Sequence, residues 1–204
     1  MLLPGGYPEL HAPTLAGSRR SLAALRQAAR HGVPLVAECG GLLLLGQSLA
    51  DAEGIPHRMA GVLPCTARRG PLSLGYRQAV VQSDGLLVRR GERLIGHEFH
   101  RWQLEPLPGA RQPAGAAEEP ETVVQVAAQP SLWQLDGWGC PSRSEGWTTP
   151  TVHASWLHLH WAGWPAIPSR LAAWSGPAGP QPPSAASSRR RSPTAQARQP
   201  SAGT

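Results

Sequence analysis

The 204-residue chain contains no lysine, and all 19 of its basic residues are arginine. Without lysine it cannot form a phosphate-binding loop of the GxxxxGK[ST] type, so nucleotide binding through such a loop is excluded. No apolar run approaches the roughly 18 residues that a membrane span needs. The start, MLLPGGYPEL, has neither the basic segment nor the long apolar segment of a signal peptide. We therefore expect a chain without a membrane partner.

Cysteine is also scarce. Cys39, Cys65 and Cys140 are widely and irregularly spaced, so they predict neither a disulfide framework nor a CxxC metal site. A reducing, cytoplasmic location fits this usage best. Histidines repeat in GHEFH and VHASWLHLHW, but no Cys, Asp or Glu is spaced with them to complete a metal ligand set. No metal site is predicted.

The net charge of +6 is concentrated at one end. Residues 177–204 contain four arginines and no acid, which leaves about +2 for the rest of the chain. A basic tail of this composition is usually a solvated segment. The charge therefore does not indicate specific nucleic-acid binding.

The first fifty residues alternate between strand-like and helix-like patterns of apolar residues. Leu2-Leu3 resembles the end of a buried strand, and SLAALRQAAR (21–30) predicts an amphipathic helix that Ser18 or Ser21 caps. Residues 33–38 are apolar almost throughout, as in a strand buried on both faces. A second helix is expected over 40–49. This order predicts an α/β fold with a parallel sheet.

By composition, the whole chain divides into four segments. Residues 1–105 form the first part of a folded core, with further strands expected at 61–64, 74–81 and 94–104. Residues 106–145 predict an irregular, partly disordered insert rich in Pro, Gly, Ala and Gln. Residues 146–175 supply a last strand, 152–165, and a closing helix, 167–174. Residues 176–204 predict a disordered, basic, Pro/Ser/Arg-rich tail.

Cys39 is expected at the turn between the 33–38 strand and the following helix. A sharp turn lifts a side chain out of the sheet, and the helix N-terminus favours a thiolate. The same N–H groups can stabilise a negative oxygen on a substrate carbonyl. Gly40 and Gly41 allow close approach. The alternative is a small buried hydrophobe, the usual role of a free cysteine.

A thiolate nucleophile needs a base, and the late strand offers three histidines. His158 and His160 would share one face of it, with His153 on the other. Because the active crevice of an open α/β sheet lies at the carboxyl ends of its strands, a late-strand histidine could reach Cys39.

Taken in order, LLPGGYPELHA, VAECGGLLLLGQSL, GVLP, LGYRQA, GHEFHRW and VHASWLHLHWA resemble the glutamine amidotransferase domain of the cobyrinic acid a,c-diamide synthases. The resemblance covers Leu2 to about Trp102 and Glu145 to about Trp174. It implies a flavodoxin-like, class I-like α/β glutaminase domain in cobalamin biosynthesis, with glutamine as substrate.

The resemblance also implies site roles. Cys39 would attack the glutamine amide and His158 would be the base, with His160 as runner-up and His100 and Glu98 as further candidates. Backbone N–H groups of Gly40 and Gly6 would hold the oxyanion, within a substrate site that includes Gly5 and Gly41. In many relatives a glutamate two residues after the base orients it; here that position is His160.

The family enzyme is about twice as long, with an ATP-binding synthetase half before the glutaminase domain. No cofactor is therefore expected in this chain. ATP and Mg²⁺ are expected only for the synthetase half, and a separate partner protein would supply that half. The chain is expected to be truncated at the N-terminus of the glutaminase fold. Two alternatives to an active glutaminase remain. The first is an inactive remnant or non-catalytic binding domain of the same family, and the second is a different cysteine hydrolase on the same scaffold.

Overall fold

The computed structural model describes residues 1–107 and 132–174. In these residues the strands form two sheets. The smaller sheet has the order β1 (Leu2–Leu3), β2 (Leu35–Glu38), β10 (Val152–Ser155), β9 (Trp147–Thr148). The larger has the order β11 (His158–Leu159), β6 (Arg93–Pro106), β5 (Cys65–Val81), β3 (Ser48–Ala50), β4 (Pro56–Arg58). A hairpin of β7 (Trp133–Gly137) and β8 (Cys140–Glu145) extends it from β5.

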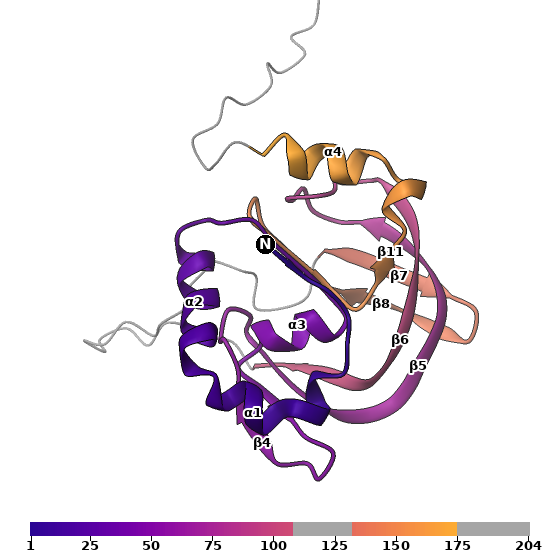
Figure 1. Cartoon of the computed structure of the whole chain (residues 1–204). Helices are drawn as coiled ribbons and strands as arrows, with labels where there is room; N and C mark the ends of the chain where they lie inside the picture. The colour runs from indigo at the N-terminus through magenta and orange to yellow at the C-terminus, as the bar shows by residue number, and fades with distance from the viewer. Residues whose placement is uncertain (108–131, 175–204) are drawn as a thin grey trace, which may run out of the picture.

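Helices cover the small sheet and close the domain (Figure 1). They are α1 (Ala12–Gly17), α2 (Arg19–Arg30), α3 (Gly40–Leu45) and α4 (Ala166–Ala172), with 3₁₀ turns η1 (Pro8–His11) and η2 (Trp161–Gly163). The predicted α2 and α4 are confirmed. Ser18 occupies the N-cap position of α2, but its hydroxyl donates to the Thr14 carbonyl and makes no capping hydrogen bond. None of the helices in the described ranges is long and apolar enough to cross a membrane.

The predicted parallel sheet is confirmed for three strands of the small sheet, β1, β2 and β10. There β2 lies between β1 and β10 and is parallel to both. Leu35 and Ala37 enter one hydrophobic core and Val36 enters a second, so β2 is buried on both faces as its sequence predicts. Most other pairings are antiparallel, and β5 and β6 run side by side as long curved strands (Figure 1). The domain is therefore mixed α/β.

The prediction of an irregular 106–145 segment is wrong for the part that the structure describes. Trp133 of β7 pairs with Glu145 of β8, and β7 also pairs with β5. Leu132, Trp133 and Leu135 are fully buried. A short run of large apolar side chains therefore outweighs the Pro- and Gly-rich composition around it. Residues 108–131, like the tail from 175, lie outside the described residues.

Two predictions after Cys39 also need correction. The helix ends at Leu45 rather than Leu49, because Gly46 leaves the helical conformation and Ser48–Ala50 forms β3. Residues 61–64 are not a strand. Their backbone N–H groups bond to carbonyls at the end of α3, with Gly61 donating to Gly46 and Val62 to Leu45, both at 2.8 Å. The segment satisfies helix carbonyls that would otherwise be unpaired.

The single strand predicted over 152–165 is divided between the two sheets. β10 ends at Ser155, and β11 pairs with β6 of the other sheet, His158 opposite His97. Glu145 fixes the change of direction: it accepts hydrogen bonds from the Ser155 hydroxyl (2.6 Å), the Trp156 backbone N–H (3.0 Å) and the Trp133 indole (2.7 Å).

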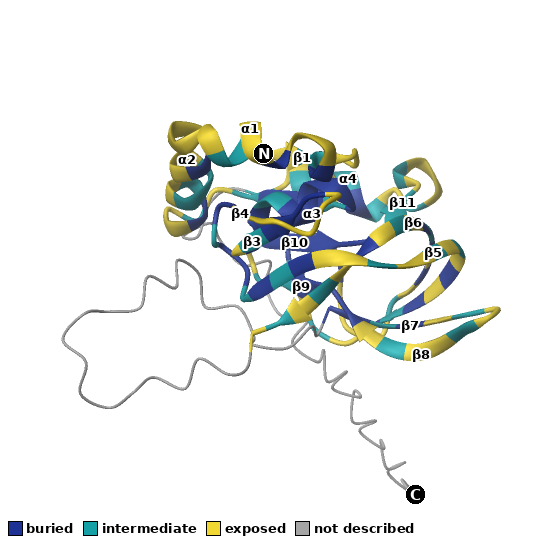
Figure 2. Cartoon of the chain, turned by 90° about the horizontal axis from the view of Figure 1, so that it is seen from below, coloured by how far each residue is buried: buried dark blue, intermediate teal, exposed yellow. Residues whose placement is uncertain are grey.

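Figure 2 shows α3 and β10 in the buried interior, and exposed residues along the outside of α1 and α2. His153 of β10 lies in this interior, fully buried and edge-on to Trp133. Burial lowers the pKa of His153 to about 4, and neither ring nitrogen has a hydrogen-bond partner in the described residues. His153 is thus a neutral core side chain, separate from the Cys39 turn.

Candidate active site around Cys39

Cys39 occupies the sharp turn between β2 and α3. Its φ of 48° makes it the one non-glycine residue with positive φ in the described ranges. Such a conformation costs a residue with a Cβ about 1–2 kcal/mol. The turn is held by the Cys39 backbone N–H, which donates to the Ser155 carbonyl at 2.8 Å. The fold thus stabilises an unfavourable backbone geometry at the position of the predicted nucleophile.

Glycines permit the close packing behind this turn. A Cβ on Gly40 would collide with the backbone of Gly6, and a Cβ on Gly41 would collide with the carbonyl of Leu3. A Cβ on Gly5 would lie 2.5 Å from Cε1 of His158. The predicted Gly5-Gly6 loop therefore lies between the start of α3 and the His158 ring.

His158 is the histidine that the fold brings to Cys39. The interactions of its ring with the Cys39 side chain first, and with the Glu38 carboxylate second, raise the pKa of His158 to about 10, although partial burial acts in the opposite direction. No hydrogen bond or ion pair in the described part of the chain joins His160 to Cys39. His160 is exposed at the start of η2.

Glu38 is a site residue that sequence reasoning missed. Its Oε2 lies 3.7 Å from Nδ1 of His158, and its Oε1 accepts a hydrogen bond from the Trp161 indole at 3.3 Å. The expected place for an orienting acid was two residues after the base, where this chain has His160. The available signal was the position of Glu38 at the end of a buried strand, directly before Cys39.

A cavity of about 320 Å³ opens beside the thiol. Its wall is mainly apolar, and Leu43, Trp102 and Trp156 contribute to it together with Gly6 and Gly40. Cys39 itself is only 6% exposed, with Sγ 3.7 Å from the carbonyl of Phe99. The sulfur therefore lies at the wall of a cavity large enough for a small molecule.

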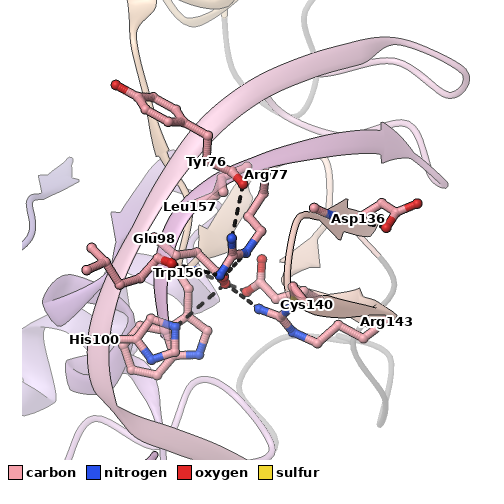
Figure 3. A network of polar contacts seen from close by, with 12 residues as sticks. Tyr76, Arg77, Glu98, His100, Asp136, Cys140, Arg143, Trp156 and Leu157 are labelled. Atoms are coloured by element: carbon pink, nitrogen blue, oxygen red, sulfur yellow. Dashed lines mark hydrogen bonds and ion pairs between the residues drawn. The ribbon is translucent and has the colours of Figure 1, made fainter. Parts of the chain in front are cut away.

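His100 and Glu98 belong to a neighbouring polar network (Figure 3). Glu98 is fully buried and accepts hydrogen bonds from Arg77 Nε at 2.7 Å and from Arg143 Nη2, with His100 Nε2 at 3.6 Å. Burial alone would raise the pKa of Glu98, but the interaction with the nearby His100 and the charge of Arg143 outweigh it and lower this pKa to about 2.

The same network orients His100. Its ring stacks on Trp156, with centroids 3.9 Å apart, and its Nδ1 donates to the Trp102 carbonyl at 2.7 Å. His100 borders the cavity, with Nδ1 bonded to the Trp102 carbonyl and Nε2 3.6 Å from the Glu98 carboxylate but without a hydrogen-bond partner in the described residues. In this arrangement Glu98 and His100 support the wall of the cavity, while His158 lies beside Cys39 and Glu38 lies beside His158.

Residues 1–165 match the model of the CobB/CobQ-like glutamine amidotransferase domain. The chain belongs to this family. It is 42% identical over 161 residues to the cobyrinate a,c-diamide synthase of Gloeobacter violaceus, an alignment that covers 78% of this chain and 30% of the relative. It is 40% identical over 175 residues to the hydrogenobyrinate a,c-diamide synthase of Streptomyces coelicolor, covering 84% and 30%.

A third relative, the cobyrinate a,c-diamide synthase of Salmonella typhimurium, is 36% identical over 167 residues, covering 81% of this chain and 33% of the relative. The chain thus spans about a third of the length of the curated relatives that it matches. Its family membership concerns the glutamine amidotransferase domain of these amide synthases.

The other two cysteines have different surroundings from Cys39. Cys65 is fully buried in β5, and burial raises its pKa to about 12. Cys140 lies half-buried in β8, where its sulfur accepts a hydrogen bond from Arg143 Nη1 at 2.6 Å. Across residues 1–107 and 132–174 no three His, Cys, Asp or Glu side chains gather as a metal site.

Proposed function

We propose that the chain catalyses the glutaminase half-reaction of an amide synthase, releasing ammonia from glutamine at Cys39. One observation carries this proposal: a cysteine in a strained turn lines a cavity and, together with Glu38, raises the pKa of the neighbouring His158 to about 10. A thiolate beside an imidazolium is the activated form of a cysteine nucleophile. The parallel order β1-β2-β10 around the turn supports the flavodoxin-like arrangement expected for this activity.

The reaction follows from these positions. The Cys39 thiolate attacks the side-chain amide carbon of glutamine, and the charge passes to the amide oxygen. His158 gives its proton to the leaving nitrogen, so that ammonia departs and a thioester remains. The neutral His158 then takes a proton from water, the hydroxide attacks the thioester, and glutamate leaves with the thiolate restored.

Backbone donors are available for the negative oxygen. Gly40 is the first residue of α3, so its N–H has no partner within the helix. The Gly6 N–H makes no hydrogen bond within the described residues and lies close to Gly40. We assign the oxyanion to these two groups, and we assign Gly5 and Gly41 the role of allowing the loop and the helix to approach.

Glu38 is proposed to orient the His158 ring and to keep it protonated. Replacing Glu38 with Gln should lower kcat/KM for glutamine about 10- to 100-fold. This loss is smaller than the roughly 10⁴-fold loss known for an aspartate in direct contact with a catalytic histidine, because Glu38 Oε2 lies 3.7 Å from Nδ1 of His158. Since Glu38 helps to raise the pKa of His158, its removal should also shift the alkaline limb of the pH–rate profile to lower pH.

The measurement is kcat/KM between pH 6 and 10 for the wild type, Glu38→Gln and the exposed control Glu53→Gln. The control should match the wild type throughout. An unchanged alkaline limb in Glu38→Gln would show that Glu38 does not act on His158.

The proposed function is tested by labelling the folded protein with 6-diazo-5-oxo-L-norleucine, a glutamine analogue that alkylates amidotransferase cysteines. Mass spectrometry of the digest should locate the modification at Cys39, with Cys65 and Cys140 unmodified. Added glutamine should protect Cys39. Equal labelling of Cys39 and Cys140, or no labelling of folded protein, would overturn the glutaminase assignment and favour a non-catalytic domain.

The relatives' names give the proposed destination of the ammonia. They are amide synthases that act on the a and c positions of cobyrinate or hydrogenobyrinate. We propose that the ammonia made here is used by an ATP- and Mg²⁺-dependent synthetase part, on the same or another chain, that amidates these carboxylates. Ammonia released without such a partner should appear in solution.

A further inference from the structure

We propose that the outer face of β5 and β6 is the docking surface for the ammonia-using synthetase part, and that the matching surface of that part is apolar at its centre and acidic at its edge. The outer face consists of alternate residues from Leu72 to Val80 of β5 and from Arg93 to Arg101 of β6. The inference rests on the proposed glutaminase function, because it names where the partner of the same site lies.

The outer face carries large apolar side chains that point into solvent. The antiparallel pairing places Leu74 opposite Phe99, so both lie on this face. Four large apolar side chains of the face are 47–74% exposed: Leu74, Tyr76, Ile95 and Phe99. Figure 3 shows the Tyr76 ring on the other side of its strand from Glu98, which belongs to the buried network. A cluster of exposed apolar groups of this kind indicates an interaction site.

The centre of the outer face is already ordered. Tyr76 lies opposite His97 in the β5–β6 pairing, and the two rings meet edge to face with centroids 5.2 Å apart. A side chain that a neighbour holds in place loses less freedom on binding, so its burial in an interface costs less. Tyr and Phe are also enriched at protein interfaces, whereas Asp and Glu are depleted there. The outer face therefore has the composition of a protein-binding surface.

The outer face is continuous with the candidate active site. Strand β11 lies on the other edge of β6 and pairs His158 with His97, so His158, His97 and Tyr76 form one row across three strands. Phe99 and Arg101 of the same face also line the Cys39 cavity. A protein bound here would therefore border both the proposed base and the cavity from which ammonia leaves. This position suits the part that uses the ammonia.

The charge of the outer face favours an acidic partner over a second copy of this chain. None of the alternate positions from Leu72 to Val80 or from Arg93 to Arg101 is Asp or Glu, and Arg93 and Arg101 are both exposed. Two copies docked through this face would bring these cations together without a counter-charge. The chain spans about a third of its curated relatives, so those relatives contain a further part that can supply the acidic surface.

The test compares the chain alone with a chimera in which it replaces the aligned region of the Gloeobacter violaceus relative. Hydroxyl-radical footprinting with mass spectrometry measures how readily each side chain is oxidised. We expect Tyr76 and Ile95 to be oxidised at least about fivefold less in the chimera, because an interface excludes water from its centre. Ile55 is the control: it is 56% exposed, lies just before β4 at the far edge of the sheet, and should not change.

Two results would overturn the docking surface. The first is equal oxidation of Tyr76 and Ile95 in both proteins, while the chimera still amidates cobyrinate with ammonium chloride and is therefore folded. The second is protection in the chain alone that grows with its concentration, which would assign the outer face to a second copy.

Variants of the outer face test the same surface through activity. In the chimera, Tyr76→Asp/Ile95→Asp should lower the amide formed per glutamine hydrolysed about 10-fold, because it buries two charges against an acidic partner. Amide formation from ammonium chloride, and ammonia release by the chain alone, should not change. Ile55→Asp is the matched control and should behave as the wild type. An unchanged ratio of amide to glutamine in the double variant would contradict the proposal.

Footprinting also separates failure of this inference from failure of the glutaminase proposal. If Tyr76 and Ile95 are protected in the chimera but the chain releases no ammonia from glutamine, the docking surface is correct and the glutaminase proposal is wrong. If the chain releases ammonia but the two side chains are not protected, the glutaminase proposal holds and the docking surface is wrong.

Discussion

Replacing Cys39 with alanine should abolish ammonia release from glutamine, with kcat reduced on the order of 10⁴- to 10⁶-fold, while the folded state persists. The size of the loss follows from the loss of the only atom proposed to bond covalently to the substrate. Alanine keeps the Cβ, so the φ of 48° remains as unfavourable as before and stability should change little. The measurement is glutaminase activity together with urea unfolding.

Two further cysteine variants sharpen this result. Cys140→Ser removes a half-buried thiol on β8 and should retain full activity. Cys39→Gly should be as inactive as Cys39→Ala. Its free energy of unfolding should be higher than that of Cys39→Ala by roughly 1 kcal/mol, because glycine adopts positive φ without a steric penalty. This value is the net gain after subtracting the greater chain entropy of glycine in the unfolded state. Glutamine hydrolysis by Cys39→Ala at the wild-type rate would rule out Cys39 as the nucleophile.

Replacing Glu98 with glutamine should destabilise the protein by about 3–5 kcal/mol. The substitution leaves the buried Arg77, 5% exposed, without its anionic partner, and also removes the carboxylate that Arg143 contacts. Glu105→Gln is the control, since it breaks an ion pair with Arg68 on the exposed edge and should cost less than about 1 kcal/mol. A Glu98→Gln loss no larger than that of Glu105→Gln would contradict this role.

The same carboxylate makes stability depend on acid pH. Because the pKa of Glu98 is about 2 in the folded protein and near 4.5 when unfolded, its contribution is complete above pH 4.5 and disappears as the pH falls toward 2. The amount lost is about 3 kcal/mol. In Glu98→Gln this part of the acid dependence should be absent. Urea unfolding of both proteins at pH 6 and pH 3 measures the difference.

The local patterns around Cys39 are readable from the sequence. The amphipathic period of 21–30 predicted α2, and the apolar 33–38 run followed by Cys39-Gly40-Gly41 predicted a buried strand and a sharp turn. These features depend on residues adjacent in the chain. His158 as the partner of Cys39 depended on the family resemblance, because periodicity alone treats His158 and His160 alike.

The features that were missed depend on contacts between distant segments. Residues 61–64 are apolar like a strand, but the unpaired carbonyls at the end of α3 hold them as a loop. The 152–165 segment has one continuous alternation, yet Glu145, ten residues earlier, redirects it after Ser155. Glu38 was hidden because its partner His158 comes from the other sheet, and no local pattern joins residues 120 positions apart.

The division of 152–165 between two sheets has a consequence for inheritance. The proposed nucleophile, Cys39, follows a strand of the small sheet, and the proposed base, His158, lies on a strand of the larger one. The two sheets are joined there through the turn at Trp156 and Leu157. Neither sheet alone contains both residues of the proposed pair. A chimera that takes one sheet from a distant relative must therefore preserve this two-residue junction and the Glu145 contacts that hold it, because they place Cys39 and His158 on the same side of the domain.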